Sequence, residues 1–437
     1  MAGSTVRRRG TRGRLPRWLL TPLQGLAESL LAADLNVVVV TSATVMLCGV
    51  GLLSIYVAEG AGGDDSSSFT IHQGTYVIAA VAVMVLVSMV DYRRWGSLAY
   101  PAFAATLILL AILLGAKILG WASPLIYPSK GAWRWIDLGP VKVQPSELAK
   151  ITYIMALAWY LRFRTNYRTL AGLIWPLGLT FLPMVLILLE PDLGTTLLLL
   201  PVFFAVLLVA GARRRHLLSL VMICVVAAPV LYRTMHDYQR MRVLGAVLQS
   251  DSMRAWLLDH PKALAALKVS SVQASQWQKD EGYQLDRSKV TLATGGLSGI
   301  RDADADCMQY DFLPERHNDF IFAVIGHKWG LIGCSLVLAC YGMILVAGCH
   351  ISAATNEPFG RLLAVGIVAL LTTQATVNVG MAIGLLPVTG MTLPFVSYGG
   401  TSLLVNGAIM GLLLSIGLRK PIMLAPEPFI FDGPATD

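Results

Sequence analysis

The sequence predicts an all-α polytopic membrane protein with ten transmembrane helices and one long extracytoplasmic loop between the seventh and the eighth. Of its 437 residues, 55% are hydrophobic and only 14% are charged, and the mean hydropathy is +0.64. In a soluble domain, about a quarter of the residues are charged. Apolar runs long enough to cross a bilayer recur along the whole chain. The net charge of +8 does not indicate nucleic-acid binding, because the basic residues cluster in short loops between these runs.

The ten spans follow the apolar runs in chain order. They cover about 37–57, 75–90, 99–119, 145–161, 170–189, 195–211, 217–233, 320–348, 360–383 and 396–417. A long polar segment of about 235–318 separates the seventh span from the eighth. We therefore expect a membrane domain over 37–418, with a tail on either side, 1–36 and 419–437.

Basic residues in the short loops predict the orientation of the chain. They follow the second, fourth, sixth and last spans: Arg93, Arg94, Arg162, Arg164, Arg168, Arg213, Arg214, Arg215, Arg419 and Lys420. Such loops face the cytoplasm, which places both termini there and the long loop outside. The basic first residues precede no cleavage site, so we interpret 1–36 as a retained tail, either disordered or carrying an interfacial helix.

Four polar motifs then fall on the exterior side. They cover 130–147, 190–195, 281–319 and 384–402. One outward-facing site could gather all four, whereas a transporter would place polar groups near the midplane, in paired broken helices. The sequence shows no obvious inverted repeat, which favours the outward-facing site over a transporter.

The first motif mixes cationic and aromatic residues. Lys130 and Arg134 could meet a phosphate, and Trp133 and Trp135 suit either the membrane interface or a platform for a sugar or lipid headgroup. In the second motif, Asp192 lies in a tight turn close to hydrocarbon, where a charge needs a partner.

Glu147 and Lys150, at the end of the first motif, are three residues apart and share a helix face. Both lie just inside a span, so we expect them to pair with each other or with neighbours. A purely structural ion pair is the alternative to a role at the site.

The third motif ends in four ionisable residues within five positions: Glu315, Arg316, His317 and Asp319. Ionisable groups at the mouth of a membrane helix indicate function. The alternative is a polar helix start with Asn318 or Asp319 as N-cap. Upstream, Lys289 and the glycines of 295–299 precede this stretch, and the glycines permit close backbone approach to a ligand.

The fourth motif contains two prolines and four glycines and cannot continue a helix. Irregular backbone at membrane depth is tolerated only where it is buried in protein or lines a cavity. The hydroxyls and backbone amides of this segment, with Ser397 and Tyr398 among them, could receive an anion.

Five of the six cysteines lie in apolar segments and only Cys307 in a polar loop, so we expect neither a disulfide framework nor a cysteine metal site.

In order along the chain, these motifs resemble those of the SEDS family (shape, elongation, division, sporulation) of polytopic membrane proteins. The matching stretches are KGAWRWIDLGP with QPSELAK, EPDLGT, FLPERHNDFIFA and GLLPVTGMTLPFVSYGGTSL, within about 37–418. The PERH stretch and the PVTGMTLPF version are more similar to RodA, the elongation branch, than to FtsW, the division branch.

The resemblance implies a peptidoglycan glycosyltransferase that polymerises lipid II at the outer face of the cytoplasmic membrane, for cell elongation and shape. Undecaprenyl pyrophosphate would be released, and the implied partner is a class B penicillin-binding protein. By motif match, Asp319 corresponds to the family's essential aspartate, Glu147 and Lys150 to its buried charge pair, Asp192 to its second buried acid, and Trp135 to a functional loop tryptophan. The alternatives are a lipid II flippase and a non-catalytic scaffold that activates the penicillin-binding protein.

Glycosyl transfer to a hydroxyl needs a base, and cations to stabilise the departing pyrophosphate. Asp319 is the expected base, with Glu315 and Arg316 as neighbours that tune it. The cation candidates are Lys130, Arg134, Lys289 and Arg316. A divalent cation, Mg or Mn, would fit the same charge, although no ligand motif demands it. Undecaprenyl-linked glycan and membrane lipids are the remaining expected partners.

Three departures from the family pattern stand out. Asn318 replaces the usual threonine, and His327 and Lys328 stand where two acids are usual, which reverses the local charge. His72 stands where arginine is usual, and a pair between His72 and Asp192 would be sensitive to pH.

Overall fold

The structure is a computed structural model that describes residues 35–60, 67–128, 133–139, 142–164, 168–235, 237–277, 281–300, 313 and 316–419. Lys130, Glu315 and Cys307, most of both tails and part of the long loop lie outside the described residues.

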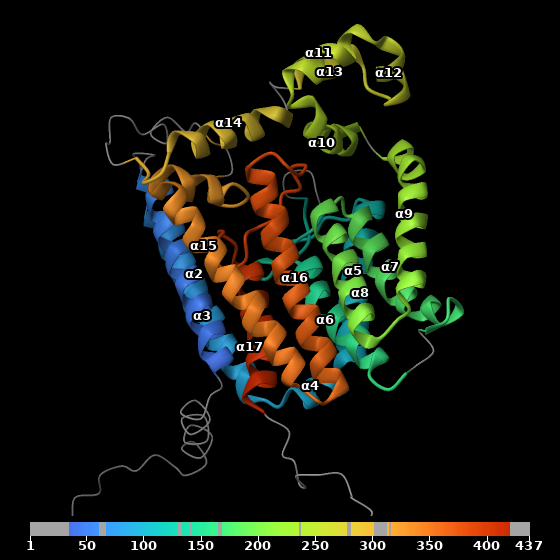
Figure 1. Cartoon of the computed structure of the whole chain (residues 1–437), viewed down its shortest axis with the longest axis vertical. Helices are drawn as coiled ribbons and strands as arrows, with labels where there is room; N and C mark the ends of the chain where they lie inside the picture. The colour runs from blue at the N-terminus through green and yellow to red at the C-terminus, as the bar shows by residue number, and fades with distance from the viewer. Residues whose placement is uncertain are drawn as a thin grey trace, which may run out of the picture.

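Long helices form one bundle, which confirms the predicted all-α membrane fold (Figure 1). Helices occupy all ten predicted ranges: α2 (Leu35–Gly60), α3 (Ser67–Met89), α5 (Ala99–Leu119), α6 (Pro145–Leu161), α7 (Ile174–Leu189), α8 (Leu193–Ala210), α9 (Arg214–Thr234), α15 (Ile321–Ala354), α16 (Pro358–Ala382) and α17 (Gly400–Leu418). Within the described ranges, eight are long and apolar enough to cross a membrane. The other two are α6, which has 17 residues and contains Glu147 and Lys150, and α9, which begins with arginines.

Side chains at the helix starts explain several boundaries. Glu59, at the end of α2, accepts hydrogen bonds from the backbone amides of Phe69 (2.7 Å) and Thr70 (3.0 Å) in the first turn of α3. Pro145 opens α6 and Pro358 opens α16, where a missing amide proton costs nothing. Asp192 is the N-cap of α8.

The two ends of the bundle differ in charge. Arg419, after α17, donates to the carbonyls of Ser88 (2.9 Å) and Met89 (2.6 Å) at the end of α3. The residues after α6 and α8 lie at this same end, because Gly96 contacts Trp159 and Gly211 contacts Arg168. The basic loops therefore gather at one end, as predicted. We call it the basic end.

The opposite end, called here the loop end, carries the small helices α10 (Asp237–Leu248), α11 (Asp251–Asp259), α12 (Pro261–Ala266), α13 (Ser271–Gln276) and α14 (Glu281–Thr294) (Figure 1). The described part of the predicted long loop is thus largely helical. Most of these helices share a small core around the buried ring of Trp277.

Four short elements complete the described part of the fold. The strands β1 (Ile136–Asp137) and β2 (Lys142–Val143) form an antiparallel pair that leads into α6. At the basic end, α4 (Tyr92–Ser97) joins α3 to α5, and the 3-10 turn η2 (Ala171–Leu173) leads into α7.

Glycines let α17 approach α3 closely. A Cβ added at Gly411 would lie 2.5 Å from the carbonyl oxygen of Met84, and one added at Gly407 would lie 2.5 Å from that of Ala80. Small residues at such crossings allow the dense packing that drives helix association in membranes. The α3–α17 contact therefore depends on these positions having no side chain.

We expect Gly411→Ala to lower the thermal unfolding midpoint in detergent, because the added methyl group separates α17 from α3. The matched control is Gly342→Ala in α15, where an added Cβ would meet no described atom within 4 Å. This control should leave the midpoint unchanged or raise it, since alanine favours helix more than glycine. Equal midpoints for the two variants would contradict the packing argument.

Candidate functional site

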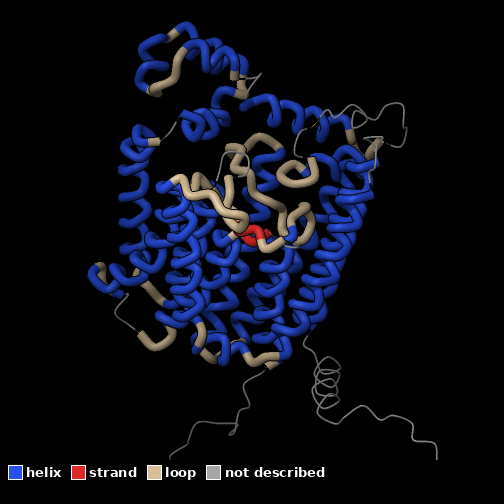
Figure 2. The backbone as a smooth tube through the Cα atoms, turned by 180° about the vertical axis from the view of Figure 1, so that it is seen from behind, coloured by secondary structure: helices blue, strands red, loops and turns tan. Residues whose placement is uncertain are grey.

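An irregular segment, 383–399, joins α16 to α17 and contacts the stretch around Asp319. Figure 2 shows helices around the loops below the loop end, as expected for irregular backbone at membrane depth, which must be enclosed by protein. Gly384 (φ +83°), Gly390 (φ +70°) and Phe395 (φ +66°) adopt left-handed conformations. Gly194, in the first turn of α8, lets the segment pack closely, because an added Cβ would lie 2.5 Å from Met391 Cγ.

Asp319 lies at the mouth of α15 and is half-buried. The N-cap of α15 is Phe320, so neither Asn318 nor Asp319 caps the helix and that alternative is wrong. The Asp319 carboxylate lies beside Gly390, where an added Cβ would be 3.5 Å from Oδ2. The carboxylate therefore stands at the positive end of a helix dipole, beside a residue without a side chain.

Ser397 and Tyr398 reach this stretch from the irregular segment. Ser397 Oγ donates to the carbonyl of Asn318 (2.6 Å) and accepts from the Leu393 amide (2.7 Å). The Tyr398 amide donates to the carbonyl of His317 (2.9 Å). The only proton of the Ser397 hydroxyl is thus used within the protein, which gives Ser397 a role in joining two parts of the backbone.

Aromatic rings border the same place. The His317 ring stacks on Phe69 of α3 with centroids 5.2 Å apart, and Phe69 meets the edge of Tyr398 at 5.3 Å. Arg316, the residue before His317 in the chain, is also buried. Of the four predicted ionisable residues, the three described ones therefore lie at one place on the loop end.

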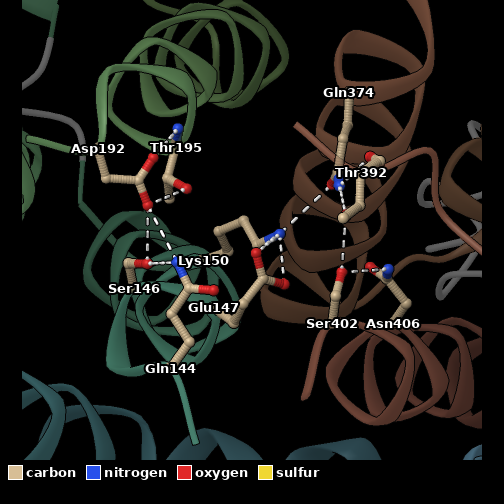
Figure 3. A network of polar contacts seen from close by, with 10 residues as sticks. All are labelled: Gln144, Ser146, Glu147, Lys150, Asp192, Thr195, Gln374, Thr392, Ser402 and Asn406. Atoms are coloured by element: carbon tan, nitrogen blue, oxygen red, sulfur yellow. Dashed lines mark hydrogen bonds and ion pairs between the residues drawn. The ribbon is translucent and has the colours of Figure 1, made fainter. Parts of the chain in front are cut away.

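Glu147 and Lys150 form the predicted ion pair (Figure 3). Lys150 Nζ lies 2.9 Å and 2.8 Å from the two carboxylate oxygens and 3.4 Å from Gln374 Oε1 of α16, and Lys150 is only 1% exposed. Gln374 Nε2 donates to the carbonyl of Thr392 (2.9 Å), and Thr392 Oγ1 lies 3.1 Å from Ser402 Oγ. The pair thus connects α6 to the irregular segment.

Asp192 binds neutral donors (Figure 3). Its Oδ2 accepts from Ser146 Oγ (3.0 Å), Gln144 Nε2 (3.2 Å) and Thr195 Oγ1 (3.0 Å), and its Oδ1 accepts from the Thr195 amide (3.2 Å). His72 is exposed on α3, and Asp192 is satisfied by these other donors, so the candidate pair between His72 and Asp192 does not form. Four donors replace the cation that the sequence led us to expect.

Arg134 is held by the turn between α7 and α8. Its Nε donates to the carbonyl of Glu190 (2.8 Å) and its Nη2 to that of Pro191, while Lys117 Nζ donates to the carbonyl of Leu189 (2.7 Å). The guanidinium thus joins two of the predicted motifs. Trp135 follows as a half-buried residue.

Lys289 lies on α14 beside the start of the irregular segment. Its Nζ is 3.1 Å from Asp286 Oδ1 and 3.4 Å from Gln249 Oε1, and Gln249 Nε2 donates to the carbonyl of Gly384 (2.6 Å). Lys289 is half-exposed and lies close to the start of the irregular segment.

The glycines of 295–299 pack against α15. A Cβ added at Gly295 would lie 1.8 Å from the carbonyl oxygen of Gly326, and one at Gly299 would lie 2.1 Å from that of Lys328. His327, a departure from the family pattern, is buried in this contact, with Nδ1 2.8 Å from Thr294 Oγ1. The close approach at Gly295 and Gly299 serves packing against α15.

Glu190 is buried (1% exposed), and its Oε1 lacks a hydrogen-bond partner among the described residues. Burial, reinforced by Asp192 and opposed by Arg134, raises the pKa of Glu190 to about 8. The folded state therefore holds this proton more tightly than the unfolded state, whose pKa is near the ordinary value of 4.5. Stability should fall as pH rises from about 4.5 to about 8 and then level off.

We accordingly expect Glu190→Gln to lessen the decline of the unfolding midpoint between pH 5 and pH 8, because glutamine has no proton to lose. Midpoints of both proteins across this range provide the test. Parallel curves for wild type and variant would contradict the raised pKa.

Comparison with known proteins agrees with this geometry. The family model described as "Cell cycle protein", FTSW_RODA_SPOVE, matches residues 36–420.

The chain belongs to this family, the SEDS family.

Relatives of this SEDS protein come from both branches. It is 34% identical to the probable peptidoglycan glycosyltransferase FtsW of Geobacter metallireducens, over 81% of this chain and 86% of that protein. It is 33% identical to the peptidoglycan glycosyltransferase MrdB of Escherichia coli K12, over 79% of this chain and 85% of that protein. Such similar identities do not separate an elongation role from a division role.

Solved structures share the fold. A chain from a structure on the coordination of polymerization and crosslinking by a peptidoglycan synthase complex has a TM-score of 0.67 and 29% identity, covering 89% of this chain and 98% of that one. The rod shape determining protein RodA of Thermus thermophilus has a TM-score of 0.58 and 27% identity, covering 89% and 97%.

Sequence reasoning missed the buried amides of this SEDS protein. Gln73, Gln374 and Asn378 each hydrogen-bond a site segment. The available signal was an amide inside, or at the start of, an apolar run, where a polar group needs a partner. For the expected divalent cation, no group of three His, Cys, Asp or Glu residues gathers within the described ranges.

Proposed function

We infer that the chain is a peptidoglycan glycosyltransferase, the activity named for its relatives in both branches. We propose that its substrate is lipid II and that its products are a lengthened glycan strand and undecaprenyl pyrophosphate. The observation that carries this proposal is the placement of Asp319. Its carboxylate lies half-buried at the loop end, beside Gly390 and close to a buried polar network.

Asp319 would act as the general base. It takes the proton from the acceptor sugar hydroxyl as that oxygen forms a bond to the anomeric carbon of the donor. The bond from this carbon to the phosphate oxygen breaks, and its electron pair leaves with the pyrophosphate. Cations stabilise the departing charge, and among the described candidates Lys289 and Arg316 lie nearest this stretch in the chain. Arg134 is engaged with the α7–α8 turn, so its role would be to position that turn.

The site would face the exterior of the cytoplasmic membrane. Support comes from the arginines gathered at the basic end, since short basic loops remain in the cytoplasm. The loop end, with Asp319, then lies where membrane-anchored lipid II must be polymerised.

A class B penicillin-binding protein is the proposed partner. Support comes from the similar chain in a synthase complex that coordinates polymerization with crosslinking. We further propose a role in elongation and cell shape, on the PERH and PVTGMTLPF stretches that are closer to the RodA branch.

A flippase is the second candidate, since it would bind the same lipid. A transporter is expected to hold its polar groups near the midplane on paired broken helices. Here the irregular segment 383–399 meets Asp319 at one end of the bundle, and the break in α15 at Gly330 (φ +62°) packs against Leu297 and Gly299 of the long loop at that same end. This arrangement favours the enzyme.

The test is polymerisation of labelled lipid II by the purified protein together with its class B partner. The proposal predicts glycan strands that a muramidase degrades, with the transpeptidase active site of the partner blocked throughout. No strands, together with movement of labelled lipid II between leaflets, would support a flippase. If neither strands nor movement of lipid II is observed, the non-catalytic scaffold remains as the function.

A further inference from the structure

Three consecutive backbone carbonyls before α15 are each bound by a donor from elsewhere in the fold. The His317 carbonyl accepts from the Tyr398 amide (2.9 Å), the Asn318 carbonyl from Ser397 Oγ (2.6 Å), and the Asp319 carbonyl from Asn378 Nδ2 (2.9 Å). The helix itself begins later, with the Phe320 carbonyl accepting from the Ala323 amide (3.0 Å). The backbone around Asp319 is therefore fixed from outside its own helix.

Asn378 supplies one of these three bonds and also binds a second carbonyl elsewhere. It is 0% exposed on α16, and its Nδ2 donates both to the Asp319 carbonyl and to the Met391 carbonyl (2.6 Å). Met391 follows Gly390, the residue beside the Asp319 carboxylate. The Asn378 amide thus sets the distance between the backbone of Asp319 and the backbone at 390–391, which lies beside the Asp319 carboxylate.

Other buried amides bind the segment 391–399. Gln374, one helical turn before Asn378, donates to the next carbonyl, that of Thr392 (2.9 Å). Gln73 of α3 is buried, and its amide joins the carbonyl of Ser397 (3.1 Å) to the amide of Gly399 (3.4 Å). The segment 391–399 is therefore pinned by buried amides on two helices, and Asn378 alone among these amides also reaches Asp319.

We propose that Asn378 is a positioning residue that holds Asp319 in the orientation needed to remove a proton. The inference rests on the proposed function, because it assigns a role to Asn378 in the reaction of Asp319. A buried amide with no such role would contribute only to stability. Without the two hydrogen bonds that Asn378 Nδ2 donates, the backbone of Asp319 and the backbone at 390–391 can move apart. Small displacements of a reacting group lower the rate by large factors.

The test compares Asn378→Leu with Asn406→Leu in the purified complex, using lipid II of defined lipid length. Asn406 is a matched control, since it is a buried amide (1% exposed) on α17 whose Nδ2 makes one long bond, 3.4 Å to Ser402 Oγ. We expect Asn378→Leu to lower kcat by roughly ten- to a hundredfold with an unchanged KM. We expect Asn406→Leu to stay within about twofold of wild type, with a similar change of unfolding midpoint.

Equal kcat values for Asn378→Leu and Asn406→Leu would overturn the inference. If Asn378→Leu unfolds at a much lower temperature than the control, Asn378→Asp replaces it, because the carboxylate keeps the size of the side chain and removes both N–H donors. Full kcat in that variant would equally overturn the inference. Asp319→Asn is measured alongside: if it remains active, the proposed base fails, whereas an inactive Asp319→Asn with an active Asn378 variant rejects only the positioning role.

Discussion

Asp319→Asn is expected to lower kcat for glycan polymerisation by about 10²- to 10⁴-fold, the usual contribution of a general base. Asparagine keeps the size of the side chain and the carbonyl contact with Asn378, but it cannot accept the hydroxyl proton. Binding of lipid II should be unchanged, because the effect falls on the chemical step. Initial rates with labelled lipid II, together with a separate binding titration, measure the two effects.

Asp259→Asn is the control for this experiment. Asp259 is exposed on α11 at the loop end and undergoes the same change of charge. Its kcat should match that of wild type. A variant at Asp319 that retained more than about a tenth of the wild-type kcat would contradict a role as general base.

Lys150→Met is expected to destabilise the protein by about 3–5 kcal/mol, because it leaves the Glu147 carboxylate as a buried charge with no cation beside it. The pair is almost fully buried, with side-chain exposures of 1% and 9%, so water cannot replace the lost partner. The unfolding midpoint in detergent should drop sharply.

The double variant Glu147→Gln/Lys150→Met separates charge pairing from packing. It removes both charges, so it should recover most of the lost stability. The kcat of the double variant for glycan polymerisation then shows whether the ion pair also affects catalysis. Such an effect could pass along the hydrogen bonds from Lys150 through Gln374 to Thr392. A double variant no more stable than Lys150→Met would contradict the charge-pairing account.

Local patterns in the sequence predicted much of this architecture. Apolar runs identified the membrane helices, and Pro145 marked the start of α6. The Glu147–Lys150 pair followed from a spacing of three residues on one helix face. Prolines and glycines predicted irregular backbone at membrane depth over 384–402, and the structure shows it over 383–399, with 400–402 already in α17.

Contacts between distant segments were harder to predict. For Asp192, we looked for a cation, but its partners are neutral residues at the start of α6, which no charge pattern marks. A glycine-rich stretch such as 295–299 suits close approach to a ligand and to a helix equally well. Only the fold shows that it packs against Gly326 and Lys328. The proposed role of Asn378 depends on the fold bringing its amide within hydrogen-bond distance of both Asp319 and Met391, which a single sequence does not reveal.

Asp319 is proposed to catalyse lipid II polymerisation at the exterior face. The most direct test of this role uses vesicles containing the protein and its class B partner with the loop end outward, and labelled lipid II in the outer leaflet only. Wild type should form glycan strands, and Asp319→Asn should bind the lipid without forming them. Equal amounts of strand from both proteins, or strands only when lipid II starts in the inner leaflet, would contradict the account.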